Sequence, residues 1–148
     1  MSHSTTAARR LTTFVSAARA AIEKLVPESR GAAATWQVGR GIVWVQWPRA
    51  DGSSFGLGLR RHLDWVTGEV ALSRAGCNPE TLPLWTGGVT RPTSPDGYRI
   101  RLGLLLHDED RWWSAGSSVR ELNQRLEWLV LQLRVKAEPR FARHPLPT

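Results

Sequence analysis

The clearest pattern along the chain is a stripe of apolar residues near its N-terminus. Between residues 5 and 26, apolar side chains recur at spacings of three and four, the period of one helix face: Leu11, Phe14, Val15, Ala18, Ile22 and Leu25. The hydroxyl residues Ser4, Thr5 and Thr6 are suitable N-caps, and Pro27 cannot continue a helix. The pattern predicts a helix over residues 5–26.

A second helical stripe lies near the C-terminus. Ser118 and Glu121 have the spacing of a capping box, in which a hydroxyl and a carboxylate satisfy the first free amides of a helix. One broad apolar face follows: Val119, Leu122, Leu126, Leu129, Val130 and Leu133. We expect this helix to end before Pro139, with residues 139–148 and 1–4 as flexible tails.

Segments rich in β-branched and aromatic residues lie between the two helices. The first covers residues 35–47 and is interrupted at Gly39-Arg40-Gly41, which is either a tight hairpin turn or a bulge in one long strand. In the next strand Phe55, Leu57 and Leu59 alternate with glycines 56 and 58. Its bare face predicts a close neighbour, either a helix that crosses the sheet or, as the less favoured alternative, a ligand.

Three further segments complete the predicted elements. Residues 63–72 read as a strand, with Thr67-Gly68 as a bulge or turn, and residues 98–107 show the strongest alternation in the chain. Trp112-Trp113 begins a short return strand. Residues 73–97 contain four prolines and form a long loop, which we expect to fold back over the sheet edge with one helical turn after Asn78-Pro79.

The order of elements is helix, several strands, helix. Short turns join neighbouring strands, and this favours antiparallel pairing. We therefore predict an α+β fold: a mainly antiparallel sheet of about five strands, with the N- and C-terminal helices packed on one face. The 148 residues have the length of one ordinary domain, so residues 1–148 are interpreted as a single domain.

Composition narrows the class of protein. Hydrophobic residues make up 41% of the chain and charged residues 22%, as in soluble globular proteins. No apolar stretch is long enough to span a bilayer, so we expect no membrane association. Cys77 is the only cysteine, which excludes a disulfide framework. With no apolar signal core near the N-terminus, this favours a cytoplasmic location.

The net charge of +7 is concentrated at the two ends of the chain. Residues 1–40 carry six basic and two acidic groups, residues 41–116 carry eight of each, and residues 117–148 carry six and three. A basic surface attracts phosphate-rich partners, so a nucleic-acid-binding accessory protein is one functional hypothesis. Arginines on the wet faces of two amphipathic helices explain the same excess and are the favoured interpretation.

The most unusual feature is the number of tryptophans, eight in 148 residues. Tryptophan is seldom fully buried, and exposed tryptophan beside arginine is typical of contact surfaces. Because Trp44 alternates with Val43 and Val45, it points away from them. We therefore expect a partner-binding surface that includes several indoles and two neighbouring arginines: Trp44, Trp47, Trp112, Trp113, Arg99 and Arg101.

No catalytic or metal motif of useful specificity occurs, and we predict no cofactor, no metal and no enzymatic activity. The most favoured function is a non-catalytic interaction domain, by analogy with small bacterial adaptor, chaperone-like and immunity-like domains, that binds a protein partner or a second copy of itself. The remaining alternative is a small-molecule binder or enzyme with a pocket beneath residues 73–97, in which His62, His107 and Cys77 are the polar groups.

Overall fold

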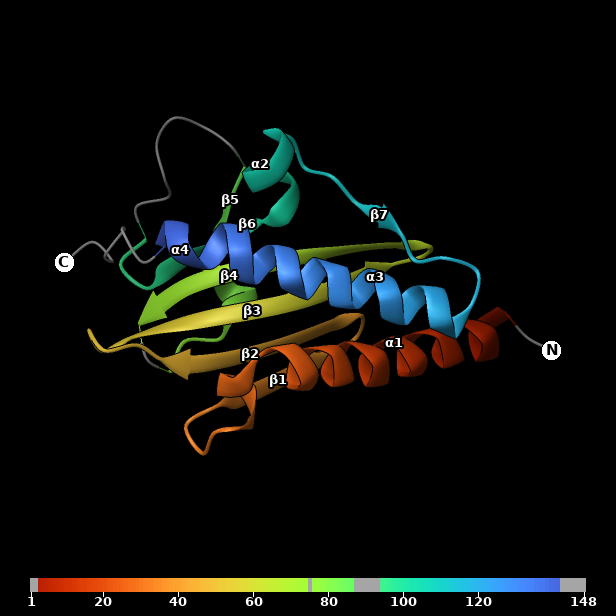
Figure 1. Ribbon diagram of the computed structural model, residues 1–148, viewed down its shortest axis with the longest axis horizontal. Helices are drawn as coiled ribbons and strands as arrows, with labels where there is room; N and C mark the ends of the chain where they lie inside the picture. Colours follow the sequence, from red (N-terminus) through yellow and green to blue (C-terminus); the bar gives the residue numbers. More distant parts are fainter. Residues whose placement is uncertain (1–2, 75, 87–93, 142–148) are drawn as a thin grey trace.

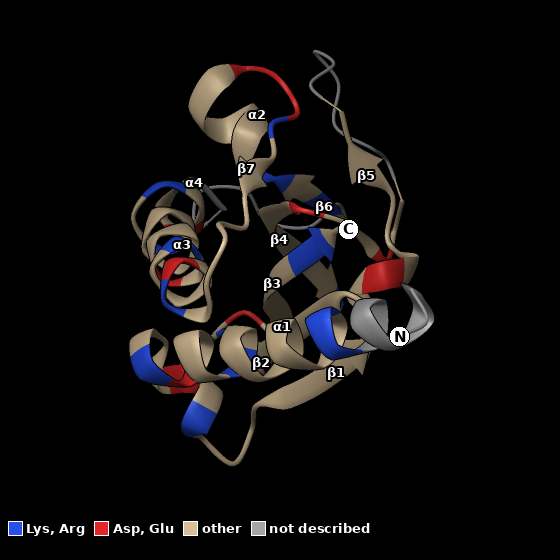
Figure 2. Cartoon of the chain, turned by 90° about the vertical axis from the view of Figure 1, so that its right-hand side faces the viewer, with Lys and Arg blue, Asp and Glu red and all other residues tan. Residues whose placement is uncertain are grey.

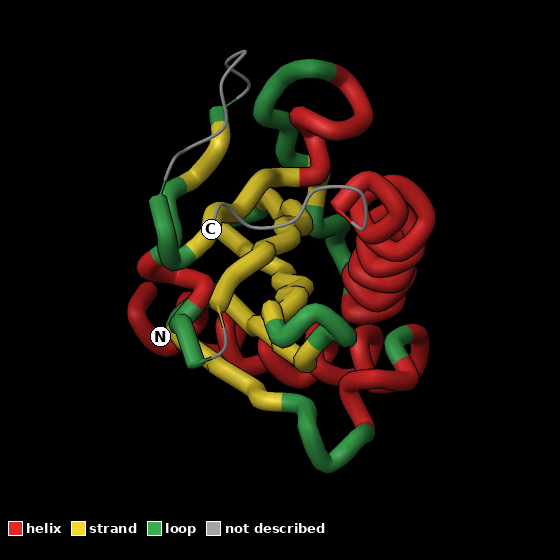
Figure 3. Tube along the Cα trace, turned by 90° about the vertical axis from the view of Figure 1, so that its left-hand side faces the viewer, coloured by secondary structure: helices red, strands yellow, loops and turns green. Residues whose placement is uncertain are grey.

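The computed structural model describes residues 3–74, 76–86 and 94–141. Two long helices lie side by side across one face of a seven-stranded sheet (Figure 1), which confirms the predicted α+β class. The helices are α1 (His3–Leu25) and α3 (Val119–Gln132). Figure 3 shows the same layers from one end, with both helices on one side of the strands.

The sheet is mainly antiparallel. Its strand order is β1-β2-β3-β4-β6-β5, and β7 pairs with the free end of β4. β5 and β6 form its parallel pair. The strands are β1 (Thr35–Gly39), β2 (Ile42–Pro48), β3 (Ser53–His62), β4 (Trp65–Arg74), β5 (Leu84–Trp85), β6 (Gly97–Arg101) and β7 (Trp113–Ser114).

The core lies between the sheet and the two helices. Alternate residues of the central strands face it, among them Val43 and Val45 on β2 and Leu57 and Leu59 on β3. Short helices complete the chain: η1 (Pro27–Arg30), η2 (Pro79–Thr81), α2 (Leu102–His107), the π-helical turn η3 (Leu133–Ala137) and α4 (Glu138–Phe141).

The capping box at Ser118 predicts the start of α3 correctly, and the structure decides between the two alternatives for the turn after Gly39. The Ser118 hydroxyl accepts a hydrogen bond from the Glu121 amide at 3.1 Å, and the Glu121 carboxylate accepts one from the Ser117 amide at 2.6 Å. The two-residue turn after Gly39 is a hairpin, since Gly39 pairs with Ile42. Gly41 there has a φ of 72°, a conformation that favours glycine.

The predicted strand over residues 98–107 is half wrong. The chain pairs with β4 only as far as Arg101 and then forms helix α2, whose Leu102 is fully buried. Gly103 allows this departure, because a Cβ atom there would lie 2.4 Å from the Arg111 amide nitrogen. Strand β7 takes the vacated place beside β4.

The C-terminal helix continues further than expected. A π-helical turn follows Gln132, and helical structure continues through Pro139 to Phe141. The rest of the predicted tail, residues 142–148, lies outside the described residues, as do residues 1–2. The N-terminal helix begins at His3, inside the stretch expected to be a tail.

The loop after β4 folds back over the sheet, as expected. Asn78 accepts a hydrogen bond from the Glu80 amide and caps the single helical turn η2. This segment covers the sheet face opposite the helices, where Leu82 packs with Trp44 and Ala71. Residues 75 and 87–93 of the predicted loop lie outside the described residues.

Candidate functional site

Trp44 is fully buried, contrary to the predicted exposure. Its side chain does point away from Val43 and Val45, but segment 76–85 covers that face of the sheet. The indole Nε1–H donates to Glu80 at 2.9 Å, and the ring lies across Gly58 of the neighbouring strand. The close neighbour expected beside the glycines is therefore this indole, and neither a helix nor a ligand.

Trp47 is also buried, so its predicted role at the surface is wrong as well. It lies on the helix-covered face of β2 and packs against Phe55, with ring centroids 5.2 Å apart. The Arg134 guanidinium lies 5.9 Å from the Trp47 ring centroid. The sheet and the C-terminal helix together enclose this indole.

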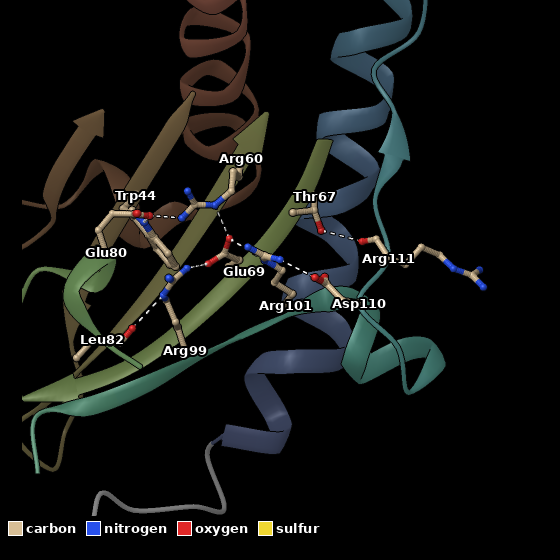
Figure 4. Close-up of polar contacts among 10 residues, drawn as sticks. All are labelled: Trp44, Arg60, Thr67, Glu69, Glu80, Leu82, Arg99, Arg101, Asp110 and Arg111. Carbon is tan, nitrogen blue, oxygen red and sulfur yellow. Dashed lines mark hydrogen bonds and ion pairs between the residues drawn. The ribbon is translucent and has the colours of Figure 1, made fainter. Parts of the chain in front are cut away.

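Arg99 and Arg101 belong to an internal ion-pair network (Figure 4). Both bind Glu69, whose carboxylate has no exposed surface: Arg99 Nη1 lies 2.5 Å from Glu69 Oε1, and Arg101 Nε lies 3.4 Å from Oε2. Arg60 Nε lies 2.6 Å from Oε2. The side chains of Arg99 and Arg101 are only 15% and 18% exposed, so they do not form the predicted contact surface.

The same network anchors the covering segment to the sheet. Arg60 also binds Glu80, and Arg99 Nε donates to the Leu82 carbonyl at 3.1 Å. Burial raises the pKa of Glu80, but the Trp44 indole and the Arg60 guanidinium outweigh it and lower that pKa below its ordinary value. Because the arginines of this network have acidic partners, its geometry indicates a structural clamp.

Trp112 and Trp113 are both half-buried but have different surroundings. Trp113 packs edge-on against Trp128, with centroids 5.5 Å apart, as part of the core. Trp112 has the Arg101 guanidinium 5.2 Å from its ring centroid and lines a shallow depression of about 390 Å³ with His62 and Trp65. Of the six predicted contact residues, only Trp112 lies beside an exposed tryptophan, Trp65.

The most exposed large apolar side chains of this region lie on the turn between β3 and β4. Leu63 is 69% exposed and Trp65 is 51% exposed. Leu63 has a φ of 53°, a conformation that a leucine rarely adopts. Asp64 is the one residue of His62-Leu63-Asp64-Trp65 that is common in turns, but the positive φ falls on Leu63, which the sequence assigns to a strand.

A basic cleft adjoins this turn. It has a volume of about 830 Å³ and lies between residues 9–13 of α1 and the first turn of α3, with Arg9, Arg10 and Arg61 on its walls beside Asp64. A neighbouring depression of about 340 Å³ adds Arg40 and Leu63 to the same region. Figure 2 views the molecule from this end. We call the region the hairpin end and define it by Arg9, Arg10, Arg40, Arg61, Leu63, Trp65 and Trp112.

Positive charge at the hairpin end is only partly compensated. Arg10 lies 3.3 Å from Asp64, whereas no carboxylate among the described residues lies within ion-pair distance of Arg9, Arg40 or Arg61. Burial lowers the pKa of Arg61, the nearby charge of Arg10 lowers it further, and the smaller opposing effect of Asp64 does not cancel them. Arg10 and Arg61 therefore repel each other.

The groups expected to form an alternative catalytic pocket do not meet under the covering segment. His62 lies at the hairpin end, His107 lies beside Trp113 and the Cys77 carbonyl accepts a hydrogen bond from Gln46 at 2.9 Å. The space between this segment and the sheet holds Trp44 and Leu82. Within the described ranges, no group of three His, Cys, Asp or Glu side chains could hold a metal ion.

Comparisons with known proteins add no assignment. No family model, no curated protein and no solved structure matches this chain. A search of the described helices for one both long and apolar enough to cross a bilayer found none.

Proposed function

We propose that this chain is a non-catalytic protein-interaction domain of the adaptor, chaperone-like or immunity-like type, and that it binds its partner through the hairpin end. The observation that carries the proposal is the exposure of Leu63 and Trp65 at one β-hairpin, Leu63 on its turn and Trp65 at the start of β4. Arg40 and Arg61 lie beside Leu63, and neither has a carboxylate partner among the described residues. Interface hot spots are enriched in tryptophan and arginine, which supports this surface over the others.

The conformation of Leu63 supports the same conclusion. Asparagine or glycine would form the β3–β4 turn at lower conformational cost than leucine, whose φ of 53° costs about 1–2 kcal/mol. The side chain contributes little to the core in return, because it is 69% exposed. A strained residue with an exposed apolar side chain is typical of a binding site, where contact with a partner recovers the cost.

Affinity capture with matched variants tests the proposal. The baits are the whole wild-type chain, a Leu63→Ser/Trp65→Ser variant and a control Leu131→Ser/Val135→Ser variant that changes two exposed apolar residues of the C-terminal helix. We expect a protein that the wild type and the control capture and the hairpin variant does not. Calorimetry with that purified protein should then give about tenfold or greater weakening for the hairpin variant.

Light scattering of the concentrated chain tests whether its partner is a second copy of itself. A dimer that the hairpin substitutions dissociate and the control substitutions leave intact supports the proposal, with a second copy as the partner. The proposal is overturned if the chain is strictly monomeric and no bait captures a protein. It is also overturned if all three baits capture the same partners equally well. If the wild-type bait retains nucleic acid and no protein, the result refutes the proposed protein-interaction function and favours the nucleic-acid alternative.

A further inference from the structure

The two long helices run in the same general direction, although they cross at an angle (Figure 2), and both begin toward the hairpin end. In Figure 1 both run from the right-hand end to the left, and the β3–β4 turn reaches the same right-hand end. The residue pairs along them agree with this direction: Thr13 lines the cleft with Leu122, and further on Lys24 pairs with Glu127 at 2.7 Å. The first residues of α3 line the cleft, so the positive end of that helix dipole adds to the charge of the arginines.

The chain supplies little negative charge to balance this end. An acidic residue in the first turn of a helix is favourable, but α1 has none there. Glu121 of α3 is already occupied, since its carboxylate accepts hydrogen bonds from the amide and the hydroxyl of Ser117. Asp64 pairs with Arg10 at 3.3 Å and is the remaining carboxylate on the cleft walls.

We propose that the basic cleft binds an acidic segment of the protein partner, with carboxylates paired to Arg9, Arg10 and Arg61 and an apolar side chain packed on Leu63. This inference rests on the proposed function and specifies the chemistry of the partner. Arginine suits the role because its planar guanidinium can bind a carboxylate through two parallel hydrogen bonds.

A protein segment fits this surface better than a nucleic acid. Asp64 and Glu121 stand on the cleft walls among the arginines and would repel a continuous phosphate backbone. Leu63, the most exposed large apolar residue among those described, lies beside Arg10 and Arg61 of the cleft and offers packing to an aliphatic side chain. Trp65, on which a base could stack, lines a separate depression with Trp112. A segment that alternates acidic and apolar residues satisfies both features.

Fluorescence anisotropy with a defined probe tests the inference. The probe is a labelled ten-residue peptide in which glutamate alternates with leucine, and the same peptide with glutamine in place of glutamate is its uncharged control. A single-stranded oligonucleotide of equal charge distinguishes the nucleic-acid alternative. All three are titrated into the whole chain at low salt, since exposed ion pairs weaken as ionic strength rises.

Variants assign the binding to the cleft. Arg9→Gln/Arg61→Gln should weaken binding of the acidic peptide by about tenfold, whereas Arg30→Gln/Arg74→Gln, which removes equal charge from exposed positions away from the cleft, should change it by less than about twofold. Asp64→Asn removes the competing carboxylate from Arg10 and should strengthen binding by about threefold.

Three results would overturn the inference: no binding of the acidic peptide, equal loss with both pairs of arginine variants, or tighter cleft-dependent binding of the oligonucleotide. A partner captured through Leu63 and Trp65 would leave the proposed function standing in each of these cases. Conversely, acidic-peptide binding with no captured protein and no dimer would refute the proposed function alone.

Discussion

The packing of one indole against a glycine gives the most direct test of this structure. A methyl group at Gly58 would lie 2.6 Å from Cε3 of Trp44, well inside contact distance. Trp44 cannot withdraw, because its ring is fully buried and its Nε1–H is bonded to Glu80. Gly58→Ala should therefore force the indole or the strand to move.

The expected cost follows from two opposing effects. Overpacking a core by one carbon costs about 1–3 kcal/mol, whereas replacing glycine by alanine in an ordinary strand conformation recovers about 0.4–1 kcal/mol from the unfolded chain. The net loss for Gly58→Ala is about 1.3 kcal/mol, which lowers the melting temperature of a chain this long by about 3–5 °C. Urea denaturation followed by far-ultraviolet circular dichroism measures it.

Gly56 provides the matched control on the same strand and face. A methyl group there meets its nearest neighbours, Ala71 and Gln46, at 3.4 Å, which is ordinary contact. Gly56→Ala should therefore raise the free energy of unfolding by about 0.4–1 kcal/mol. In a Trp44→Leu background the cost of Gly58→Ala should disappear. Equal stability of the two alanine variants in the wild-type background would refute the placement of Trp44.

Three further predictions concern the ion-pair network and the hairpin end. Glu69→Gln should lower the free energy of unfolding by about 3 kcal/mol, because it removes the buried carboxylate that three partly buried arginines share and leaves Arg99 without an ion-pair partner among the described residues. Glu109→Gln, in an exposed pair, should cost less than about 0.5 kcal/mol, and urea denaturation of both variants measures the contrast. The pKa of Glu80 is lowered in the fold, so its contribution to stability is complete above the ordinary glutamate pKa and is lost as pH falls through the pKa of the folded state. The free energy of unfolding, measured between about pH 3 and 7, should therefore fall less steeply toward acid pH for Glu80→Gln than for the wild type. Leu63→Asn should raise the free energy of unfolding by about 0.5–1 kcal/mol, since asparagine tolerates a positive φ, and weaken partner binding in calorimetry; a loss of stability would contradict the proposed strain.

Elements with strong local signals could be predicted from the sequence. The apolar stripe of α1 and the capping box at Ser118 both act within one or two turns of chain, so no tertiary information is needed to read them. Alternation also predicted which residues of β2 and β3 share a face. The α+β class followed from these elements and from the short connections between strands.

What covers each face could not be predicted in the same way. Alternation correctly directed Trp44 away from Val43, but only tertiary structure shows that segment 76–85 lies over that face. The excess of arginine was equally ambiguous. Arg99 and Glu69 are 30 residues apart in the sequence, and their 2.5 Å contact depends on the pairing of β4 with β6.

The prediction of the β3–β4 turn failed for a different reason, and the reason bears on function. Turn prediction relies on residues that tolerate a positive φ, and Leu63 is not one of them. The nearby arginines Arg10 and Arg61 likewise lie close enough to repel each other, and α1 has no acidic residue in its first turn. Two departures from what stability favours, one conformational and one electrostatic, thus occur at the same end of the molecule. Their coincidence is the physical reason to look for the partner there, and it implies that substitutions which relieve either cost weaken binding while they stabilise the chain.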